Sequence, residues 1–290
     1  MQRQATWESI FKPGMAEDFF EPAPPGNFDP AAAAFSPVNA WWLSELSRLV
    51  YRRNPGETGA DWRLPSRSGI LSRVGLREQA TFFRYGIFAA LVLSDDPMAL
   101  PFGVLVFRGS SGRLDNWMAN FDTRPQPWPP GGRVHAGFKA ALLGIWPEIL
   151  EALRRLQRPV FYTGHSLGAA LATLAASLRP PRAVYTFGSP RVGNSGFARL
   201  MEAIPVYRLA GARDIVTRIP PAIFPFGYRH VGLALPLGTQ CRPGMQPASG
   251  TAMDPAAQSS GWPRSLDRLG QPPVFLADHA PVRYTDALAI

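Results

Sequence analysis

One short segment, residues 160–172, constrains the fold more than any other part of the 290-residue chain. It reads VFYTGHSLGAALA, so an apolar run enters a G-x-S-x-G turn and a run of small residues leaves it. A strand, a tight turn and a helix in this order form a nucleophile elbow. Side chains two positions either side of the serine would collide there, which accounts for Gly164 and Gly168. The pattern predicts that Ser166 stands at a helix N-terminus, where the helix dipole favours developing negative charge.

Apolar runs bounded by turn residues alternate along the chain with stretches of helical periodicity. Such runs are typical of strands buried on both faces, and their alternation with helices predicts an α/β fold whose mostly parallel sheet is covered on both faces. The expected strands are residues 85–93, 103–107, 160–163, 183–187 and 206–209, and the expected helices are residues 40–51, 138–156 and 194–204. Pro147 should kink the second helix or begin its second half.

Two segments lack this alternation. Residues 1–38 are rich in Pro, Ala and Phe, which predicts an irregular arm that lies over the rest of the protein. Residues 39–290 are then expected to form the catalytic domain. Residues 237–273 are full of Gly, Pro, Ser and Ala and predict a long loop.

A serine hydroxyl is a weak nucleophile without a base, and the chain offers four histidines. His165 adjoins Ser166 and cannot fold back onto it, and His135 precedes the elbow. The order serine, acid, histidine that this kind of turn implies leaves His230 and His279. His279 follows the long loop and can reach across the sheet, whereas His230 enters an apolar strand and is favoured as a structural histidine. For the G-x-S-x-G segment itself, the alternative interpretation is an ordinary glycine-rich turn in which Ser166 only caps the helix.

The orienting acid should follow a strand that comes after the elbow. Asp214 has that position, because it follows the apolar run 206–209. The alternative is a surface salt bridge between Asp214 and Arg213 or Arg218.

An oxyanion hole needs two hydrogen-bond donors that are fixed before the reaction. One is the backbone N–H of Leu167, the residue after the nucleophile. The second should lie after an earlier strand, and Ser110 follows the run 103–107 with both an N–H and a hydroxyl to offer.

Six motifs in order complete the pattern, and on them the chain resembles the class 3 lipase family, the fungal-type α/β-hydrolase lipases. They are FRGS (107–110), VHAGF (134–138), TGHSLGAALA (163–172), TFGSPRVGN (186–194), RDIVTRIP (213–220) and DH (278–279). The resemblance implies an α/β-hydrolase fold and a triacylglycerol lipase-like ester hydrolase. It also implies a catalytic triad of Ser166, Asp214 and His279, with Ser110 and Leu167 as oxyanion donors. A phospholipase A1, a short-chain esterase and a non-catalytic binding module remain alternatives.

The resemblance further implies a lid after the FRGS motif, at about residues 111–122. Leu114, Trp117, Met118 and Phe121 can share one helical face there, which would lie in a lipid interface. The alternative is a short helix packed on the core. The implied partner is a lipid or ester at an interface, with transient contact to a membrane or lipid-droplet surface.

Composition argues against other classes of function. The formal charge of +9 comes from 28 Arg and 2 Lys that are scattered, without the basic run of a nucleic-acid-binding arm. No phosphate-binding loop or metal-ligand spacing occurs, so we expect no cofactor and no metal. Cys241 is the only cysteine, and no apolar stretch has the features of a secretory signal or a membrane span. We expect a soluble protein, cytoplasmic or exported by another route.

Overall fold

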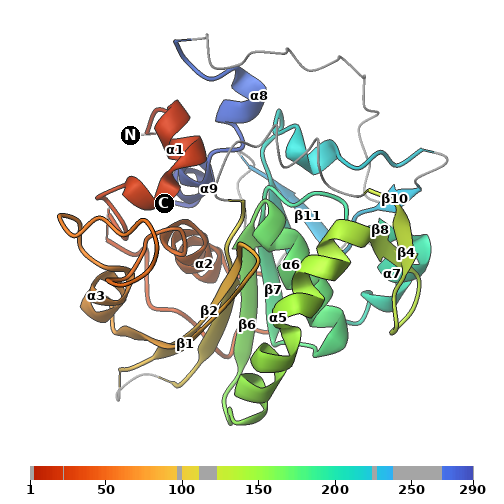
Figure 1. Cartoon of the computed structure of the whole chain (residues 1–290), viewed down its shortest axis with the longest axis horizontal. Helices are drawn as coiled ribbons and strands as arrows, with labels where there is room; N and C mark the ends of the chain where they lie inside the picture. Colours follow the sequence, from red (N-terminus) through yellow and green to blue (C-terminus); the bar gives the residue numbers. More distant parts are fainter. Residues whose placement is uncertain are drawn as a thin grey trace.

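The computed structural model describes residues 3–21, 23–96, 100–110, 123–223, 227–237 and 270–289. Its centre is a seven-stranded sheet with the order β1-β2-β3-β6-β7-β9-β11 (Figure 1). The strands are β1 (Leu76–Arg84), β2 (Ile87–Ser94), β3 (Gly103–Phe107), β6 (Val160–His165), β7 (Ala183–Phe187), β9 (Val206–Ala210) and β11 (Leu233–Pro236). The strands from β3 to β11 run parallel, while β1 and β2 are antiparallel at one edge. The prediction of a mostly parallel α/β sheet is confirmed.

Helices cover both faces of this sheet. α5 (Ala136–Arg154) and α6 (Leu167–Leu178) pack on one face, and α2 (Pro37–Leu49) and α9 (Pro281–Leu288) pack on the other (Figure 1). Alternate residues of β3 enter the two cores: Val104 and Val106 face α2, and Leu105 and Phe107 face α6. Because both sides are buried, the strand reads as an unbroken apolar run. The other helices are α1 (Trp7–Phe11), η1 (Pro13–Met15), α3 (Arg67–Arg73), α7 (Ser195–Leu200), η2 (Val216–Arg218) and α8 (Val274–Ala277).

Several strands have no clear pattern in the sequence, for physical reasons. β1 is an edge strand whose residues are largely exposed or half-buried, so its sequence LREQATFFR is mostly polar. A second, four-stranded sheet has the order β10-β8-β5-β4 and consists of strands too short to show any periodicity. These are β4 (Pro125–Pro127), β5 (Arg133–His135), β8 (Gly193–Asn194) and β10 (Tyr228–Arg229).

The predicted helices lie where they were expected, but some of them begin or end at other residues. α5 runs through Pro147 as one helix and begins two residues before its predicted start, because His135 Nδ1 accepts a hydrogen bond from the Gly137 N–H at 3.1 Å. Asn194 caps α7 as predicted, with its Oδ1 accepting from the Phe197 N–H at 3.1 Å. That helix ends at Leu200, earlier than predicted.

The N-terminal arm is more ordered than its sequence suggested. It contains the short helices α1 and η1, and α2 begins inside it at Pro37. Phe19, Phe20 and Phe35 are buried in the core on the α2 face. The Phe35 ring lies 5.8 Å from the ring of Tyr185 in β7 and 5.5 Å from that of Tyr207 in β9. The arm therefore supplies part of the core.

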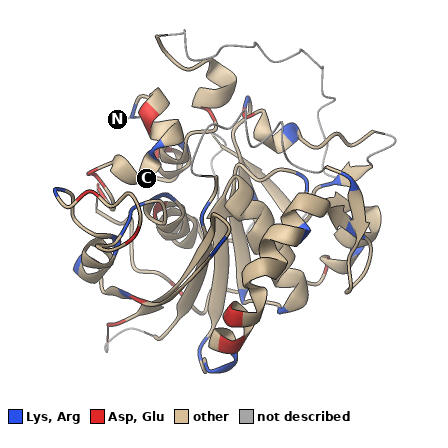
Figure 2. Cartoon of the chain, viewed as in Figure 1, with Lys and Arg blue, Asp and Glu red and all other residues tan. Residues whose placement is uncertain are grey.

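The remaining expectations concern charge, membrane spans and two loops. Lys and Arg are spread over separate elements of the fold (Figure 2). Within the described ranges, none of the helices has the length and apolar character needed to cross a bilayer. The predicted lid and residues 238–269 of the predicted long loop lie outside the described residues.

Replacement of Phe35 tests the role of the arm in the core. Phe35→Ala should lower the free energy of unfolding by roughly 3–5 kcal/mol, as for a buried Phe elsewhere in a core. Phe83, which is 64% exposed on β1, is the matched control. Phe83→Ala should change stability by no more than about 0.5 kcal/mol. Chemical denaturation measures both, and equal effects of the two changes would show that the arm is only loosely attached.

Candidate active site

Ser166 lies between the end of β6 and the start of α6, on a strained backbone. Its φ is 59° and its ψ is −124°, a region that residues other than glycine rarely adopt. The surroundings hold it there: the Ser166 N–H donates to the Phe187 carbonyl at 3.0 Å, and the Ser166 carbonyl accepts from the Ala169 N–H at 3.0 Å. The serine is 3% exposed.

The two glycines of the motif are required by contact rather than by conformational freedom. A Cβ on Gly164 would meet the backbone of Gly168, and a Cβ on Gly168 would meet the carbonyl oxygen of Phe107 at the end of β3. Helix α6 therefore approaches β6 and β3 at backbone distance. Any side chain at either position would push the helix, and Ser166 with it, away from the sheet.

Asp214 and His279 meet although 65 residues separate them in the chain. Asp214 follows β9, and His279 lies between α8 and α9. His279 Nδ1 is 2.8 Å from Asp214 Oδ2, and both residues are completely buried. Since a carboxylate only accepts hydrogen bonds, a neutral imidazole here carries its proton on Nδ1 and its lone pair on Nε2. Within the described part of the chain, that buried Nε2 has no hydrogen-bond partner.

The alternative of a surface salt bridge at Asp214 does not fit these contacts. Arg213 pairs with Asp278 at 3.1 Å, and Arg218 donates to the Ala212 carbonyl at 3.0 Å. The Asp214 carboxylate instead accepts from the Val216 N–H through Oδ1 at 2.9 Å.

Two residues at this pair were not identified from the sequence as site residues. The Tyr284 hydroxyl, on α9, donates to the same Asp214 Oδ2 that contacts His279. Burial and the neighbouring carboxylate raise the pKa of Tyr284 well above its ordinary value, so it stays a donor. Gly188 has a φ of 59°, and a Cβ there would lie 2.8 Å from Asp214 Oδ2 and 2.9 Å from His279 Nδ1. Gly188 belongs to the TFGSPRVGN motif, which is a sequence signal for it. Tyr284 has no such signal, because its contact with Asp214 arises only in the folded chain.

The two predicted oxyanion donors lie on elements that meet at the elbow. The N–H of Leu167 is at the first position of α6, where a helix offers no internal acceptor. The Ser110 Oγ is buried and lacks a partner among the residues described. A Cβ on Gly109 would lie 2.7 Å from the His165 carbonyl, so the loop that carries Ser110 runs directly against the elbow.

Arg108 adds positive charge near this loop. Its side chain is buried, and its guanidinium lies 4.8 Å from the ring centroid of Phe88. Burial lowers the pKa of Arg108 to about 10, so the group remains charged at neutral pH. A buried cation two residues before Ser110 favours negative charge at this edge of the sheet.

The other histidines have structural contacts. His165 Nε2 is 2.7 Å from the His279 carbonyl, and the two rings lie 4.5 Å apart. Burial and the neighbouring His279 hold the pKa of His165 well below its ordinary value, so it stays neutral. His230 Nε2 is 2.7 Å from the Thr217 carbonyl.

Over the described ranges, the structure shows no group of three or more side chains suited to hold a metal ion. The predicted lid residues Leu114, Trp117, Met118 and Phe121 lie outside those ranges.

This geometry is that of an α/β-hydrolase fold, and comparison with known proteins shows which family the chain resembles. Residues 104–224 match the family model described as Lipase (class 3). The chain is 38% identical to a lipase of Rhizomucor miehei over 146 residues and 38% identical to secreted mono- and diacylglycerol lipase 1 of Fusarium solani over 144 residues. Each match covers 44% of this chain, and the chain spans about two fifths of these relatives, 39% and 41%.

The fold comparison agrees. The crystal structure of a lipase from Rhizopus microsporus var. chinensis superposes with a TM-score of 0.55 and 25% identity, covering 77% of this chain and 83% of that one. The predicted resemblance to the class 3 lipase family and the predicted α/β-hydrolase fold are both confirmed. The matched region contains Ser110, Ser166 and Asp214, and His279 lies beyond it.

Two glycine-to-alanine changes, with opposite expected effects on the free energy of unfolding, test the close packing at the elbow. Gly168→Ala should destabilise the protein by at least ~1–3 kcal/mol, because the new methyl group meets the backbone of β3. Gly144 lies in the middle of α5, where a Cβ would meet only the Arg84 side chain at 4.0 Å. Gly144→Ala should stabilise by about 0.5–1 kcal/mol, as alanine does within a helix. Thermal or chemical unfolding measures both, and a stabilising Gly168→Ala would refute the close approach.

Proposed function

We propose that this protein is a serine hydrolase that cleaves the carboxylic esters of lipids through an acyl-enzyme on Ser166. The observation that carries the proposal is the coincidence of two unusual features. Ser166 has a strained backbone at the N-terminus of α6, and the buried His279–Asp214 pair leaves Nε2 without a partner. A hydrolase needs such a nucleophile and such a base at one edge of the sheet.

In the first half-reaction, Ser166 Oγ attacks the ester carbonyl while His279 Nε2 takes the hydroxyl proton. Asp214 keeps the imidazole in the correct tautomer and stabilises its positive charge. The carbonyl oxygen becomes an oxyanion, which the Leu167 N–H and the N–H and hydroxyl of Ser110 stabilise. When the tetrahedral intermediate collapses, the bond to the alcohol oxygen breaks and His279 returns the proton to that oxygen. An alcohol leaves, and the acyl group stays on Ser166.

The second half-reaction repeats these roles with water. His279 Nε2 takes a proton from a water molecule, whose oxygen attacks the acyl carbon at the same oxyanion site. Collapse breaks the bond to Ser166 Oγ, which takes the proton back from His279. The products are a carboxylic acid and free enzyme, so no cofactor or metal is needed for the balance.

The substrate class is the finer part of the proposal. We infer an acylglycerol substrate, because the relative from Rhizomucor miehei is named a lipase and the one from Fusarium solani a mono- and diacylglycerol lipase. Within that class we propose a triacylglycerol. The amphipathic sequence of residues 111–122 supports action at a lipid surface, where an apolar lid would be stabilised in its open position. Phospholipase A1 and short-chain esterase activity remain the competing forms.

Three alanine substitutions test the chemistry. Ser166→Ala and His279→Ala should each lower kcat on a short soluble ester by roughly 10⁴-fold, since triad residues act as a unit. The double variant should lose little more. His230→Ala is the matched control and should retain nearly full turnover, because its Nε2 bonds to the backbone carbonyl of Thr217. Full activity of Ser166→Ala would refute the nucleophile, and inactivity of His230→Ala with an active His279→Ala would refute the assigned base.

The substrate class is tested by comparing three esters under one set of conditions. Emulsified triacylglycerol, phosphatidylcholine vesicles and a short soluble ester are supplied to the wild type, with Ser166→Ala as the blank. A triacylglycerol lipase should hydrolyse the emulsion fastest, with a rise in rate as the substrate passes its solubility limit. A preference for phosphatidylcholine at the sn-1 position would make the protein a phospholipase A1. A preference for the short ester, with a smooth response through the solubility limit, would make it an esterase.

A further inference from the structure

The N-terminal arm lies against the segment that carries His279. Ile10 of α1 is buried in a small apolar cluster with residues from both sides of the candidate acid–base pair. Val216 comes two residues after Asp214, and Ala280 comes directly after His279. The N-terminal and C-terminal segments therefore pack side by side next to the Asp214–His279 contact (Figure 1).

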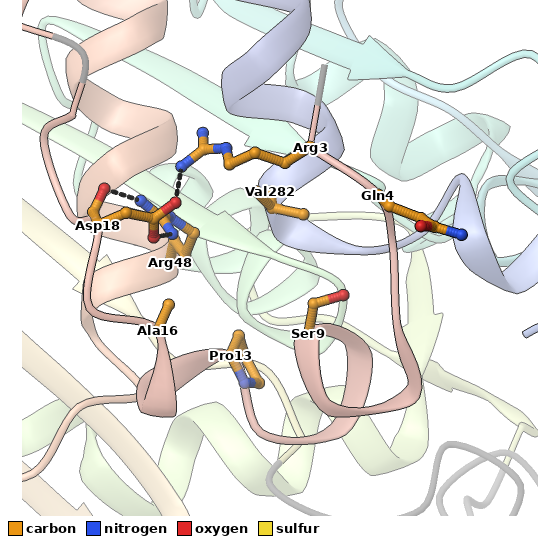
Figure 3. Close-up of a pocket in the computed structure, with 8 residues that line it drawn as sticks. All are labelled: Arg3, Gln4, Ser9, Pro13, Ala16, Asp18, Arg48 and Val282. Atoms are coloured by element: carbon orange, nitrogen blue, oxygen red, sulfur yellow. Dashed lines mark hydrogen bonds and ion pairs between the residues drawn. The ribbon is translucent and has the colours of Figure 1, made fainter. Parts of the chain in front are cut away.

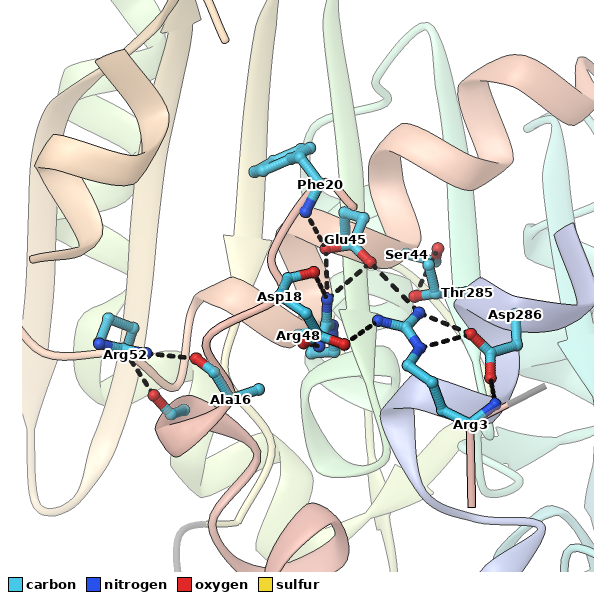
Figure 4. A network of polar contacts seen from close by, with 11 residues as sticks. Arg3, Ala16, Asp18, Phe20, Ser44, Glu45, Arg48, Arg52, Thr285 and Asp286 are labelled. Carbon is cyan, nitrogen blue, oxygen red and sulfur yellow. Dashed lines mark hydrogen bonds and ion pairs between the residues drawn. The ribbon is translucent and has the colours of Figure 1, made fainter. Parts of the chain in front are cut away.

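A second contact joins the arm to the last turn of α9. The Arg3 N–H donates to Asp286 Oδ2 at 2.6 Å, and Arg3 Nε donates to Asp286 Oδ1 at 2.6 Å (Figure 4). Asp286 is two residues beyond Tyr284, whose hydroxyl holds the carboxylate of Asp214. Arg3 of the arm thus binds α9, the helix that also contacts the candidate acid Asp214.

The other end of the same guanidinium is tied to α2. Arg3 donates to Asp18, and Arg48 donates to the second oxygen of that carboxylate at 2.6 Å. Arg48 also pairs with Glu45 at 2.9 Å, and both of these α2 side chains are almost completely buried. α2 in turn packs on β6, the strand that leads to Ser166. A continuous set of ion pairs therefore runs from the helix after His279 to the helix beneath the nucleophile strand (Figure 4).

The electrostatics of this network favour the charged forms of Arg3 and Asp18 but not that of Glu45. Burial works against ionisation of Asp18, yet the charges of Arg48 and Arg3 and their hydrogen bonds lower its pKa below the ordinary value. Burial raises the pKa of Glu45, and Arg48 and the Phe20 N–H oppose that rise. Arg3 and Arg48 together face three carboxylates, those of Asp18, Glu45 and Asp286.

We propose that Arg3 is a positioning residue for the Asp214–His279 pair. α9 has only eight residues, and a helix of that length is marginal without tertiary contacts. Arg3 fixes its last turn through Asp286, so that Tyr284 and His279 keep their places on Asp214. The expected effect on catalysis rests on the proposed function, whereas the positioning of α9 by Arg3 rests on the contacts alone.

Arg3 lies at the partly exposed edge of the network, so we expect the protein to remain folded when Arg3 is replaced. Its side chain is 25% exposed and that of Asp18 is 37% exposed. A pocket of about 160 Å³ lies beside them, lined by Ser9, Pro13, Ala16 and Val282 among others (Figure 3). Water can enter this pocket and solvate the carboxylates that a shorter, uncharged residue would leave.

The decisive experiment compares Arg3→Met, Asp286→Asn and their double variant. Each single change should lower kcat on a short soluble ester by roughly 10-fold with KM within about twofold, since misplaced catalytic groups slow the chemical step. The double variant should lose no more than the singles, because both changes remove the same contact. Arg3→Lys should recover part of kcat. Arg63→Met, which breaks an exposed pair with Asp61, is the matched control and should leave kcat unchanged.

A spectroscopic measurement separates this proposal from the proposed function. The proton on His279 Nδ1, held by Asp214, should give a downfield proton NMR signal that His279→Ala removes. The signal should broaden through exchange with water in Arg3→Met and stay sharp in Arg63→Met. An unchanged signal and unchanged kcat in Arg3→Met would overturn the proposal, even with a lower melting temperature. A wild type that hydrolyses no ester, with the signal still dependent on Arg3, would refute the proposed function and leave the positioning role supported.

Discussion

The backbone contact between α6 and the two strands beneath it is the constraint on which the site depends. Gly164 and Gly168 meet without side chains, and Gly168 also touches the carbonyl of Phe107 in β3. This contact holds Ser166 at a φ of 59°, which an isolated turn would not favour. It also brings the helix N-terminus, with the Leu167 N–H, to the end of the strand that leads to Ser110. The positions of Ser166, Leu167 and Ser110 are therefore set by the same packing.

His279 is positioned in a different way, from a distant part of the chain. His279 belongs to a short C-terminal segment that reaches the sheet through side-chain contacts rather than through a strand. Its ring bonds to Asp214, its carbonyl bonds to His165, and the following helix contacts Asp214 through Tyr284. N-terminal elements support this segment from the other side, through α2 and the arm. Chain segments from both ends thus meet around one carboxylate.

Sequence reasoning succeeded where local pattern and local structure coincide. The buried strands β3, β7 and β9 were predicted because burial on both faces leaves a continuous apolar run. Asp214 and His279 were selected from chain order and their positions after structural elements, and the structure brings them together. Tyr284 was not selected because nothing in its helix indicates that α9 turns one side toward Asp214. The ordered arm was missed for a similar reason: its Phe residues are spaced without periodicity and become core only against α2 and the sheet.

The buried polar atoms that lack partners give this arrangement a physical meaning. Among the described residues these atoms include Ser110 Oγ, His279 Nε2 and two nitrogens of Arg108. A buried polar group without a hydrogen bond costs folding free energy, typically ~1–3 kcal/mol, and native proteins keep few of them. Others belong to Arg3, Arg48 and Thr186, but Ser110 and His279 are two of the predicted site residues. An ester that enters with its carbonyl toward Ser110 would supply the missing acceptor, and the Ser166 hydroxyl would supply the missing donor to His279. On the proposed function, the Ser110 hydroxyl would gain its partner only when the substrate binds, and an interaction completed in this way contributes to the transition state rather than to the resting protein.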